Sequence, residues 1–177
     1  FKKVFKYYHH YFERKTAFDE AQILGELSEK LRSEVSSFMA FSTFSSADLF
    51  HKYDVKYLTL ILLITKPLRL QVDEVVFESG QVGIEMYLIT SGKVMAVYKT
   101  SQSNKGVRFG QGETFGELCT LGLAERRQES VRALEITELL SISKFDLFNT
   151  LGESAPHVLA DMRRCTIRKY NTLYQNK

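Results

Sequence analysis

The sequence predicts an α+β protein in which helices come first, a small antiparallel β-roll of jelly-roll type follows, and further helices end the chain. Three observations predict this order. Residues 1–66 contain no proline and a single glycine, as helical segments tend to do. From Leu68 onward, short β-rich runs alternate with glycines, which is typical of short strands joined by turns. Helical periodicity returns at Lys144.

Composition and length are those of an ordinary globular protein. The chain has 177 residues, of which 44% are hydrophobic and 25% are charged, and its net charge is +3. This charge is too small to argue for nucleic acid as a partner. The longest nearly apolar run, Leu58–Thr65, is far shorter than the ~20 residues that span a bilayer. No signal peptide opens the chain, which starts in helical rhythm without Met, so we expect a fragment of a longer protein.

The reactive residue types form no pattern of a catalytic or metal site. Cys119 and Cys165 lie far apart and lack metal-ligand spacing, and such sparse use of cysteine fits a reducing compartment. Neither a Ser-His-Asp spacing nor a zinc signature is present. We therefore predict a protein that binds and transmits, and not an enzyme.

The first region carries apolar residues at steps of three and four positions, which is the spacing of one helix face: Leu24, Leu27, Leu31, Val35 and Phe38. Asp19 followed by Gln22 has the pattern of a capping box, and Ser28 is placed to cap a second helix. A further helix is predicted around residues 54–65, with Pro67 ending it.

The predicted roll covers about residues 68–143, and the glycines within it are expected to mark turns: Gly80, Gly83, Gly92, Gly106, Gly110 and Gly112. Residues 131–144 are predicted to hold the two closing strands. Pro156 interrupts the helical pattern that follows, and a last helix is expected to run to about Tyr174. Apolar and small residues share one face of this last helix: Leu159, Met162, Thr166, Tyr170 and Leu173.

Residues 115–134 read FGELCTLGLAERRQESVRAL and combine groups that suit a nucleotide. Gly116 allows the backbone to approach a ligand, and successive N–H groups in a tight turn can bind a phosphate. Arg127 would add a positively charged guanidinium whose N–H groups suit phosphate oxygens, and Glu117 could accept a hydrogen bond from a sugar hydroxyl. A single arginine fits a phosphodiester better than a triphosphate. The alternative is structural, since Gly-Glu is a common dipeptide and paired arginines on a loop are usually solvated.

Three segments resemble one known family. Residues 115–133, FGELCTLGLAERRQESVRA, resemble the phosphate-binding cassette of cyclic-nucleotide-binding domains, and residues 78–98, ESGQVGIEMYLITSGKVMAVY, resemble the roll that precedes it. Residues 7–35, YYHHYFERKTAFDEAQILGELSEKLRSEV, look like the C-linker of HCN and CNG cation channels. The cassette alone also occurs in kinases, exchange factors and bacterial transcription factors. The resemblance of residues 7–35 to the C-linker points to the channels.

The resemblance implies a helical C-linker over residues 1–53 and a cyclic-nucleotide-binding domain over residues 54–177. The domain would consist of an eight-stranded β-roll at about 68–143, interrupted by a cassette helix, and of helices at 144–177 that end in a lid over the ligand. The C-linkers of four subunits would form a ring below a pore domain in the same chain. The fragment would then be a cytoplasmic domain of a homotetrameric membrane protein, which we expect in the plasma membrane.

The resemblance also implies a set of ligand-binding residues: Gly116, Glu117, Leu118, Cys119, Arg126, Arg127, Gln128, Lys169 and Leu173. Glu117 would bind the ribose 2′-hydroxyl, and Arg127 would pair with the cyclic phosphate. Gly116 and Cys119 would lie on the phosphate and ribose side, while the purine would contact the last helix near Lys169, Thr172 and Leu173. Arg126 stays an alternative to Arg127, because one extra residue follows Glu117 compared with the family pattern.

Two residues depart from the family. Gln128 stands where the family has a threonine that helps to hold phosphate and guanine, so cAMP is predicted in preference to cGMP. Glu129 places a negative charge near the expected phosphate, and such a like-charge pair costs ~1–4 kcal/mol at a few ångströms.

Three functions follow from these patterns. The first is a gating module that binds cyclic nucleotide and transmits closure of the last helix to a channel pore. The second is an assembly or coupling domain whose pocket is degenerate or filled by its own chain. The third is a cyclic-nucleotide sensor of a membrane transporter. The basic residues at 163–169 resemble a nucleic-acid patch, but no helix-turn-helix follows them, so nucleic acid is not predicted as a partner.

Overall fold

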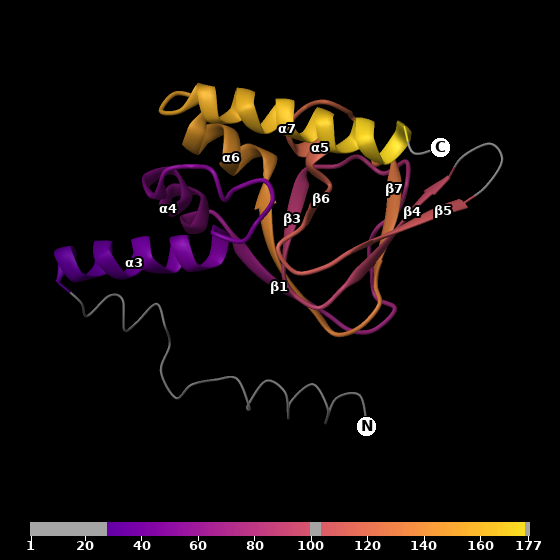
Figure 1. The fold of residues 1–177 in the computed structure, drawn as a ribbon, viewed down its shortest axis with the longest axis horizontal. Helices are drawn as coiled ribbons and strands as arrows, with labels where there is room; N and C mark the ends of the chain where they lie inside the picture. The colour runs from indigo at the N-terminus through magenta and orange to yellow at the C-terminus, as the bar shows by residue number, and fades with distance from the viewer. Residues whose placement is uncertain (1–27, 100–103, 176–177) are drawn as a thin grey trace. The chain divides into compact units, whose positions relative to one another are not determined.

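The computed structural model describes residues 28–99 and 104–175, and it shows helices on both sides of a β-roll in the chain (Figure 1). The helices are α3 Glu29–Phe44, α4 Val55–Leu63, α5 Glu117–Thr120, α6 Lys144–Leu151 and α7 Pro156–Gln175. The strands are β1 Lys66–Leu70, β2 Val75–Phe77, β3 Glu85–Ser91, β4 Val94–Lys99, β5 Asn104–Phe109, β6 Thr114–Phe115, β7 Glu129–Ala133 and β8 Thr137–Ser143. The chain divides into two compact units, residues 1–38 and 39–177. The second unit holds the roll.

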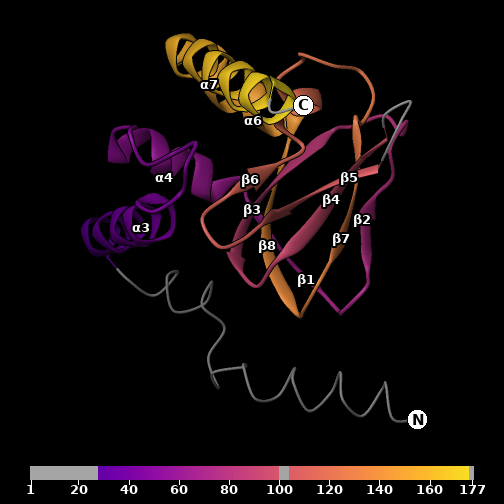
Figure 2. The same ribbon diagram turned by 45° about the vertical axis from the view of Figure 1, so that its right-hand side comes forward.

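The roll consists of two four-stranded antiparallel sheets, with strand orders β1-β8-β3-β6 and β2-β7-β4-β5 (Figure 2). Helix α5 interrupts the strands between β6 and β7, as the resemblance implies. The two closing strands are confirmed, but they belong to different sheets, since β7 pairs with β2 and β4 while β8 pairs with β1 and β3. The predicted α+β fold class is therefore confirmed.

Strand β3 separates two hydrophobic cores. Tyr87 and Ile89 point into the interior of the roll, while Met86 and Leu88 belong to the core that the roll shares with α4, α6 and α7. Four consecutive buried residues result, and the run is apolar on both strand faces because both faces are covered. Among the described residues, the helices therefore pack mainly on one sheet, and one buried helical residue, from α7, belongs to the core of the roll.

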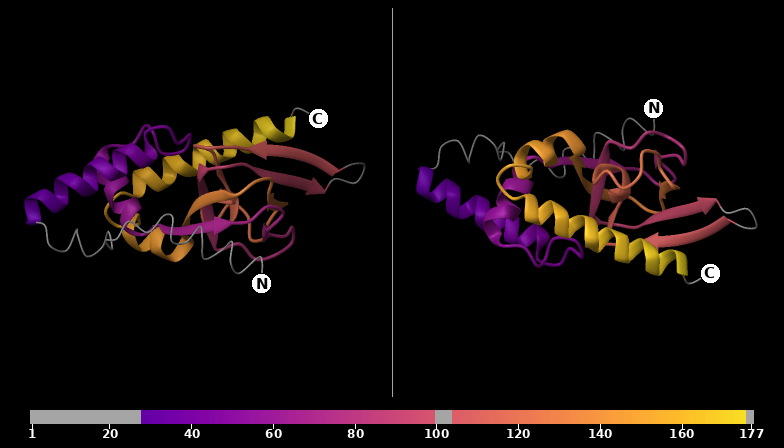
Figure 3. Two further views of the ribbon diagram at one scale, coloured as in Figure 1. Left: turned by 90° about the horizontal axis from the view of Figure 1, so that it is seen from below. Right: turned by 90° about the horizontal axis from the view of Figure 1, so that it is seen from above.

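That residue is Tyr170, whose ring lies within the core of the roll. The predicted inward face of α7 is confirmed, because Leu159, Met162, Thr166 and Tyr170 are buried. Figure 3 shows α7 extending along the roll when it is seen from above. Helix α7, which the resemblance predicts to be a lid, therefore has side chains packed against the interior of the roll.

Side-chain caps mark the starts of α3, α4 and α6. The Asp54 side chain accepts a hydrogen bond from the Lys56 N–H at 3.1 Å at the start of α4, and the Ser143 hydroxyl accepts one from the Asp146 N–H at 3.0 Å at the start of α6. The predicted cap is also found at α3, where the Ser28 hydroxyl accepts from the Leu31 N–H at 3.4 Å. The helix predicted at 54–65 is confirmed as α4.

Two sequence predictions need correction. Pro67 does not end α4, which stops at Leu63; it lies inside β1, where an edge strand tolerates a residue without an N–H group. Gly106 does not mark a turn, since it lies within the edge strand β5 and pairs with Val97. The capping box at residues 19–22 lies outside the described residues, and the domain boundary between residues 53 and 54 stays a prediction.

Candidate functional site

The cassette, residues 115–133, begins with a glycine in a backbone conformation that other residues rarely adopt. Gly116 has φ +79° and precedes the single turn of α5. A Cβ atom at this position would lie 2.5 Å from Arg127 Nη1, so both the backbone conformation and the available space require glycine. Strand β6 holds this turn against β3, where Phe115 pairs with Tyr87.

Arg127 is fixed by backbone groups of the roll. Its side chain donates to the Gly116 carbonyl through Nη1 at 3.0 Å and to the Glu85 carbonyl through Nη2 at 2.7 Å. The guanidinium also lies 4.0 Å from the centre of the Phe77 ring, in a cation–π contact. Arg127 is only 5% exposed, so its charge is held next to the Gly116 turn with little freedom.

The neighbouring Arg126 and Gln128 point elsewhere. Arg126 is exposed and donates to the Gly80 carbonyl at 2.9 Å. The Gln128 side chain is also exposed and donates to the carbonyl of Arg126 at 2.8 Å. Of the two predicted arginines, Arg127 is the one that lies beside Gly116.

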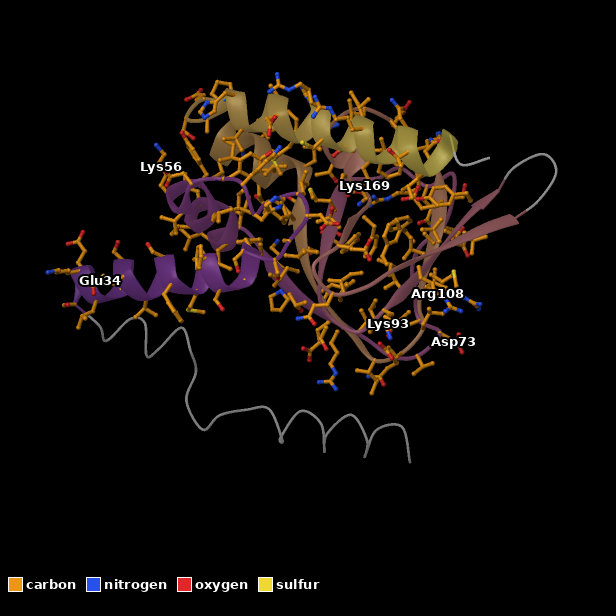
Figure 4. All side chains as sticks on the ribbon, viewed as in Figure 1. Glu34, Lys56, Asp73, Lys93, Arg108 and Lys169 are labelled. Atoms are coloured by element: carbon orange, nitrogen blue, oxygen red, sulfur yellow. The ribbon has the colours of Figure 1, made fainter. Side chains whose placement is uncertain are left out.

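Glu117 is fully buried and accepts hydrogen bonds from three side chains. Thr114 Oγ1 donates to its Oε1 at 2.5 Å, and Lys169 Nζ lies 2.6 Å from the same oxygen. Tyr170 Oη donates to Oε2 at 3.1 Å. Lys169 also donates to the Thr114 carbonyl and lies 5.1 Å from the centre of the Phe109 ring. Figure 4 shows Lys169 between α7 and the strands.

These contacts decide the charge of Glu117. Burial alone would raise the pKa of its carboxyl group, but the ammonium of Lys169 and the hydrogen bonds from Lys169 and Thr114 outweigh burial. The pKa therefore lies below its ordinary value. Glu117 is a buried carboxylate with a paired ammonium, which is a stable arrangement only while both charges stay together.

Glu129 is a second buried carboxyl group, on the inward face of β7. It is 2% exposed, and its Oε1 lies 3.5 Å from Tyr170 Oη. Burial, followed by the negative charge of Glu117, raises the pKa of Glu129 to about 7. Arg127 and Lys169 oppose this rise. Tyr170 thus lies between two acidic groups. Its place on the predicted inward face of α7 indicated its burial, but not these two partners.

A cavity of about 350 Å³ touches only part of the predicted set. Its lining includes Glu117, Lys169, Thr172 and Leu173, together with Phe109. The other predicted residues do not line it. Leu118 is half-buried and Cys119 is buried, and the pKa of the Cys119 thiol is raised by burial. The structure therefore brings Gly116 and Arg127 together, and separately Glu117, Lys169 and Tyr170.

Within residues 28–99 and 104–175, no group of three or more His, Cys, Asp or Glu side chains could hold a metal ion. The same ranges contain no helix that is long and apolar enough to cross a membrane.

Comparison with protein-family models gives a match over residues 67–154, from within β1 to beyond the end of α6, to the family described as the cyclic nucleotide-binding domain.

Residues 67–154 are therefore a cyclic nucleotide-binding domain.

Two curated relatives of this cyclic nucleotide-binding domain are channels by their names. The chain is 36% identical over 154 residues to potassium/sodium hyperpolarization-activated cyclic nucleotide-gated channel 4 of Oryctolagus cuniculus, covering 87% of the chain and 13% of the relative. It is 33% identical over 181 residues to channel 3 of Homo sapiens, covering 99% of the chain and 23% of the relative. The chain thus spans less than a quarter of either relative.

Solved structures show the same fold in other proteins. The N-terminal domain of a transcriptional regulator from Streptomyces coelicolor A3(2) matches with a TM-score of 0.61 and 22% identity, covering 76% of this chain and 94% of that domain. The catabolite activator protein of Thermus thermophilus matches with a TM-score of 0.63 and 25% identity, covering 72% of this chain and 60% of that protein.

Proposed function

We propose that the chain is the cytoplasmic ligand-sensing and gating module of a tetrameric cation channel, and that it binds cAMP in preference to cGMP. The observation that carries this proposal is the arrangement of Arg127 and Glu117 around Gly116 within a cyclic nucleotide-binding domain. Similarity to HCN channels over 87% and 99% of the chain supports the channel context. We expect the plasma membrane as the location of the whole protein.

Arg127 is suited to the cyclic phosphate. A phosphodiester carries one negative charge, and a guanidinium binds such a group through two parallel hydrogen bonds. The present acceptors of Arg127 are neutral carbonyls, so exchange of one of them for phosphate would replace a neutral acceptor by a negatively charged one and form an ion pair. Leu118 and Cys119 follow the Gly116 turn and would border the phosphate and ribose.

Glu117 would accept a hydrogen bond from the ribose 2′-hydroxyl. The purine would then lie against α7 near Thr172 and Leu173, and against Lys169 once this side chain has moved from Glu117. Gln128, in place of a threonine credited with holding guanine, is the reason for the expected preference for cAMP.

Transmission would proceed through α7. Asp161 of α7 pairs with Lys52 and accepts a hydrogen bond from Tyr53 at 3.0 Å. A shift of α7 would therefore pull on the segment that precedes α4 and, through the C-linker, bias the pore of the homotetramer. Such coupling requires that the ligand binds more tightly to one pore state than to the other. The pore domain in cis is the partner of this module, and no nucleic acid is proposed.

Calorimetric titration of the 177-residue chain with cAMP, and then with cGMP, tests this proposal. We expect saturable binding that Arg127→Gln weakens at least tenfold, because a charge-assisted bond is lost. Arg126→Gln separates the two candidate arginines, and Arg132→Gln, an exposed arginine of β7, is the control for net charge. Equal affinity of the Arg127→Gln variant and the unmodified chain would contradict the assignment.

A second candidate function is an assembly or coupling domain that binds no nucleotide. The observation that favours it is Glu129, a 2% exposed carboxyl group in the interior of the roll. A ligand that binds only the folded protein raises its melting temperature. An unchanged melting temperature at millimolar cAMP and cGMP, together with no heat of binding, would favour this second function.

A further inference from the structure

The carboxylate of Glu117 has both oxygens occupied by donors from its own chain. Besides Thr114, these donors are Lys169 and Tyr170, which lie 52 and 53 positions later in the sequence. Both come from α7. The group that the proposed function assigns to the ribose is thus held by the helix that would cover the ligand.

We propose that Lys169 and Tyr170 act as a tethered ligand of Glu117, and that a cyclic nucleotide binds to this domain only by displacing them. This inference rests on the proposed function, because it concerns the same site. An ammonium and a phenol offer hydrogen-bond donors at 2.6 and 3.1 Å, and a donor of this kind is what the free 2′-hydroxyl of a cyclic nucleotide would offer. Lys169 is then the residue that sets how tightly a nucleotide can bind.

The contact between Lys169 and Glu117 differs from a surface ion pair because its carboxylate is buried. Glu117 is 0% exposed, and a buried charge that loses its partner is strongly destabilising. Lys169 has further partners in the Thr114 carbonyl and the Phe109 ring, so its ammonium stays solvated by the protein while it holds Glu117. When a nucleotide displaces Lys169 from Glu117, new interactions must therefore replace all of these.

Tyr170 adds apolar burial to the same contact. Its side chain is 3% exposed and packs in the roll core with Phe115 and Val131. Its hydroxyl also lies 3.5 Å from Glu129, a second acidic group that keeps the phenol within the roll. Displacement of Tyr170 therefore costs hydrophobic burial as well as hydrogen bonds.

The consequence for ligand binding is a lowered apparent affinity. When the binding-competent conformation is only a fraction of the population, the apparent dissociation constant rises by the reciprocal of that fraction. Weakening the tether should raise this fraction. Lys169→Met keeps an unbranched apolar stem next to Phe109 and removes only the ammonium, so it weakens the tether without opening a large cavity.

Titration of the whole 177-residue chain with cAMP, combined with hydrogen exchange of α7 measured without nucleotide, tests the tether. We expect Lys169→Met to bind cAMP about tenfold more tightly or better than the unmodified chain, since one charge-assisted contact no longer competes. We also expect faster amide exchange in α7. Arg168→Met is the matched control, because it removes the adjacent, exposed cation of the same helix. Tyr170→Phe, which removes only a hydroxyl, repeats the test should Lys169→Met fail to fold.

The outcomes separate this inference from the proposed function. Tighter cAMP binding and faster α7 exchange in Lys169→Met, with neither in Arg168→Met, support both. Equal or weaker binding in Lys169→Met, with unchanged α7 exchange, overturns the tether and leaves the proposed function in place. If no variant binds cAMP or cGMP, the proposed function fails. In that case faster α7 exchange in Lys169→Met still supports the tether, and unchanged exchange overturns it.

Discussion

The two halves of the candidate site are built from different parts of the chain. Around Arg127, the partners are backbone carbonyls of Gly116 and Glu85, and the backbone of Arg127 itself is bonded to Gly80 and Gln81. All of these belong to the roll. Around Glu117, two of the three donors belong to α7, the helix that follows the roll.

The phosphate side around Arg127 is therefore a preformed half of the site. The ribose side around Glu117 is a conditional half, because it depends on the position of α7. The phosphate side keeps its geometry as long as the strands and their turns are folded, because its contacts do not involve α7. The ribose side keeps its geometry only while α7 is in place. A ligand that engages both halves would therefore meet one rigid surface and one that must rearrange. The following predictions perturb one half at a time, and the last one perturbs a contact of α7 outside both halves.

The largest effect is expected from Gly116→Ala on the preformed half. The new Cβ would meet Arg127 Nη1 at 2.5 Å, and a positive φ strains any residue other than glycine. We expect a loss of roughly 3–5 kcal/mol in the free energy of unfolding, measured by urea denaturation. Gly80→Ala is the control, because φ is +90° there but nothing lies within 4 Å, and it should cost only about 1 kcal/mol. Equal losses in both variants would show that Arg127 is not closely packed against Gly116.

The next effect is a pH dependence that comes from Glu129 in the conditional half. Its pKa is raised from 4.5 to about 7 by burial and by Glu117. Between these values the folded protein holds a proton that the unfolded chain has released, so stability is full below the lower value and falls as pH rises through the higher one. The expected loss from about pH 4.5 to about pH 8 is about 3 kcal/mol. Glu117 acts in the opposite direction at lower pH, because its pKa is lowered.

Urea denaturation over this pH range measures the slope. In Glu129→Gln most of the decrease should disappear, since no proton is released from the folded state. Glu135→Gln, which removes an exposed carboxyl group near the same strands, should keep the slope of the unmodified chain. A Glu129→Gln variant that retains the full slope would mean that another group is responsible.

A smaller effect is expected from Tyr170→Phe. The ring keeps its place in the roll core, but Glu117 loses the donor to Oε2. We expect a loss of about 1–2 kcal/mol in the free energy of unfolding, because a buried carboxylate is left less satisfied. Amide exchange should increase in α7 and stay unchanged in the cassette. Increased exchange around Arg127 would contradict the independence of the two halves.

The smallest effect is expected from Tyr53→Phe, the same substitution at another hydroxyl that binds a carboxylate of α7. Tyr53 donates to Asp161, whose side chain is 29% exposed and is also paired with Lys52. These groups lower the pKa of Asp161 to about 2, with Lys52 as the largest cause. Water can replace the lost hydroxyl, so we expect a loss of about 0.5 kcal/mol. A loss equal to that of Tyr170→Phe would show that burial of the acceptor carboxylate does not determine how much these hydrogen bonds contribute to the free energy of unfolding.

Much of the fold was predictable from local patterns. The cap at Ser28, helix α4 and the inward face of α7 follow from spacing and capping residues, and the structure contains all three. Pro67 and Gly106 were interpreted wrongly because both lie in edge strands, where the usual strand rules are relaxed. Which strand is an edge depends on pairing between distant segments, and this is not written in the local sequence.

The candidate site also has residues that the local sequence predicted and residues whose surroundings depend on distant segments. Gly116, Glu117 and Arg127 were recognisable because they lie within one short segment, and their roles as ligand contacts stay predictions. Glu129 was noticed only as a departure from a family pattern. Its burial and its closeness to Tyr170 depend on how α7 packs against β7, which no spacing within the cassette reveals.

The sequence by itself determined the order of helices and strands, the turn at Gly116 and the chemical groups available for a ligand, because these depend on neighbouring residues. Only the tertiary structure decided that Lys169 and Tyr170 reach Glu117 and that Glu129 lies inside the roll. The physical reason is that a buried charge selects its partner by distance in space and by exclusion of water. Both quantities arise only when segments more than 40 positions apart have packed together.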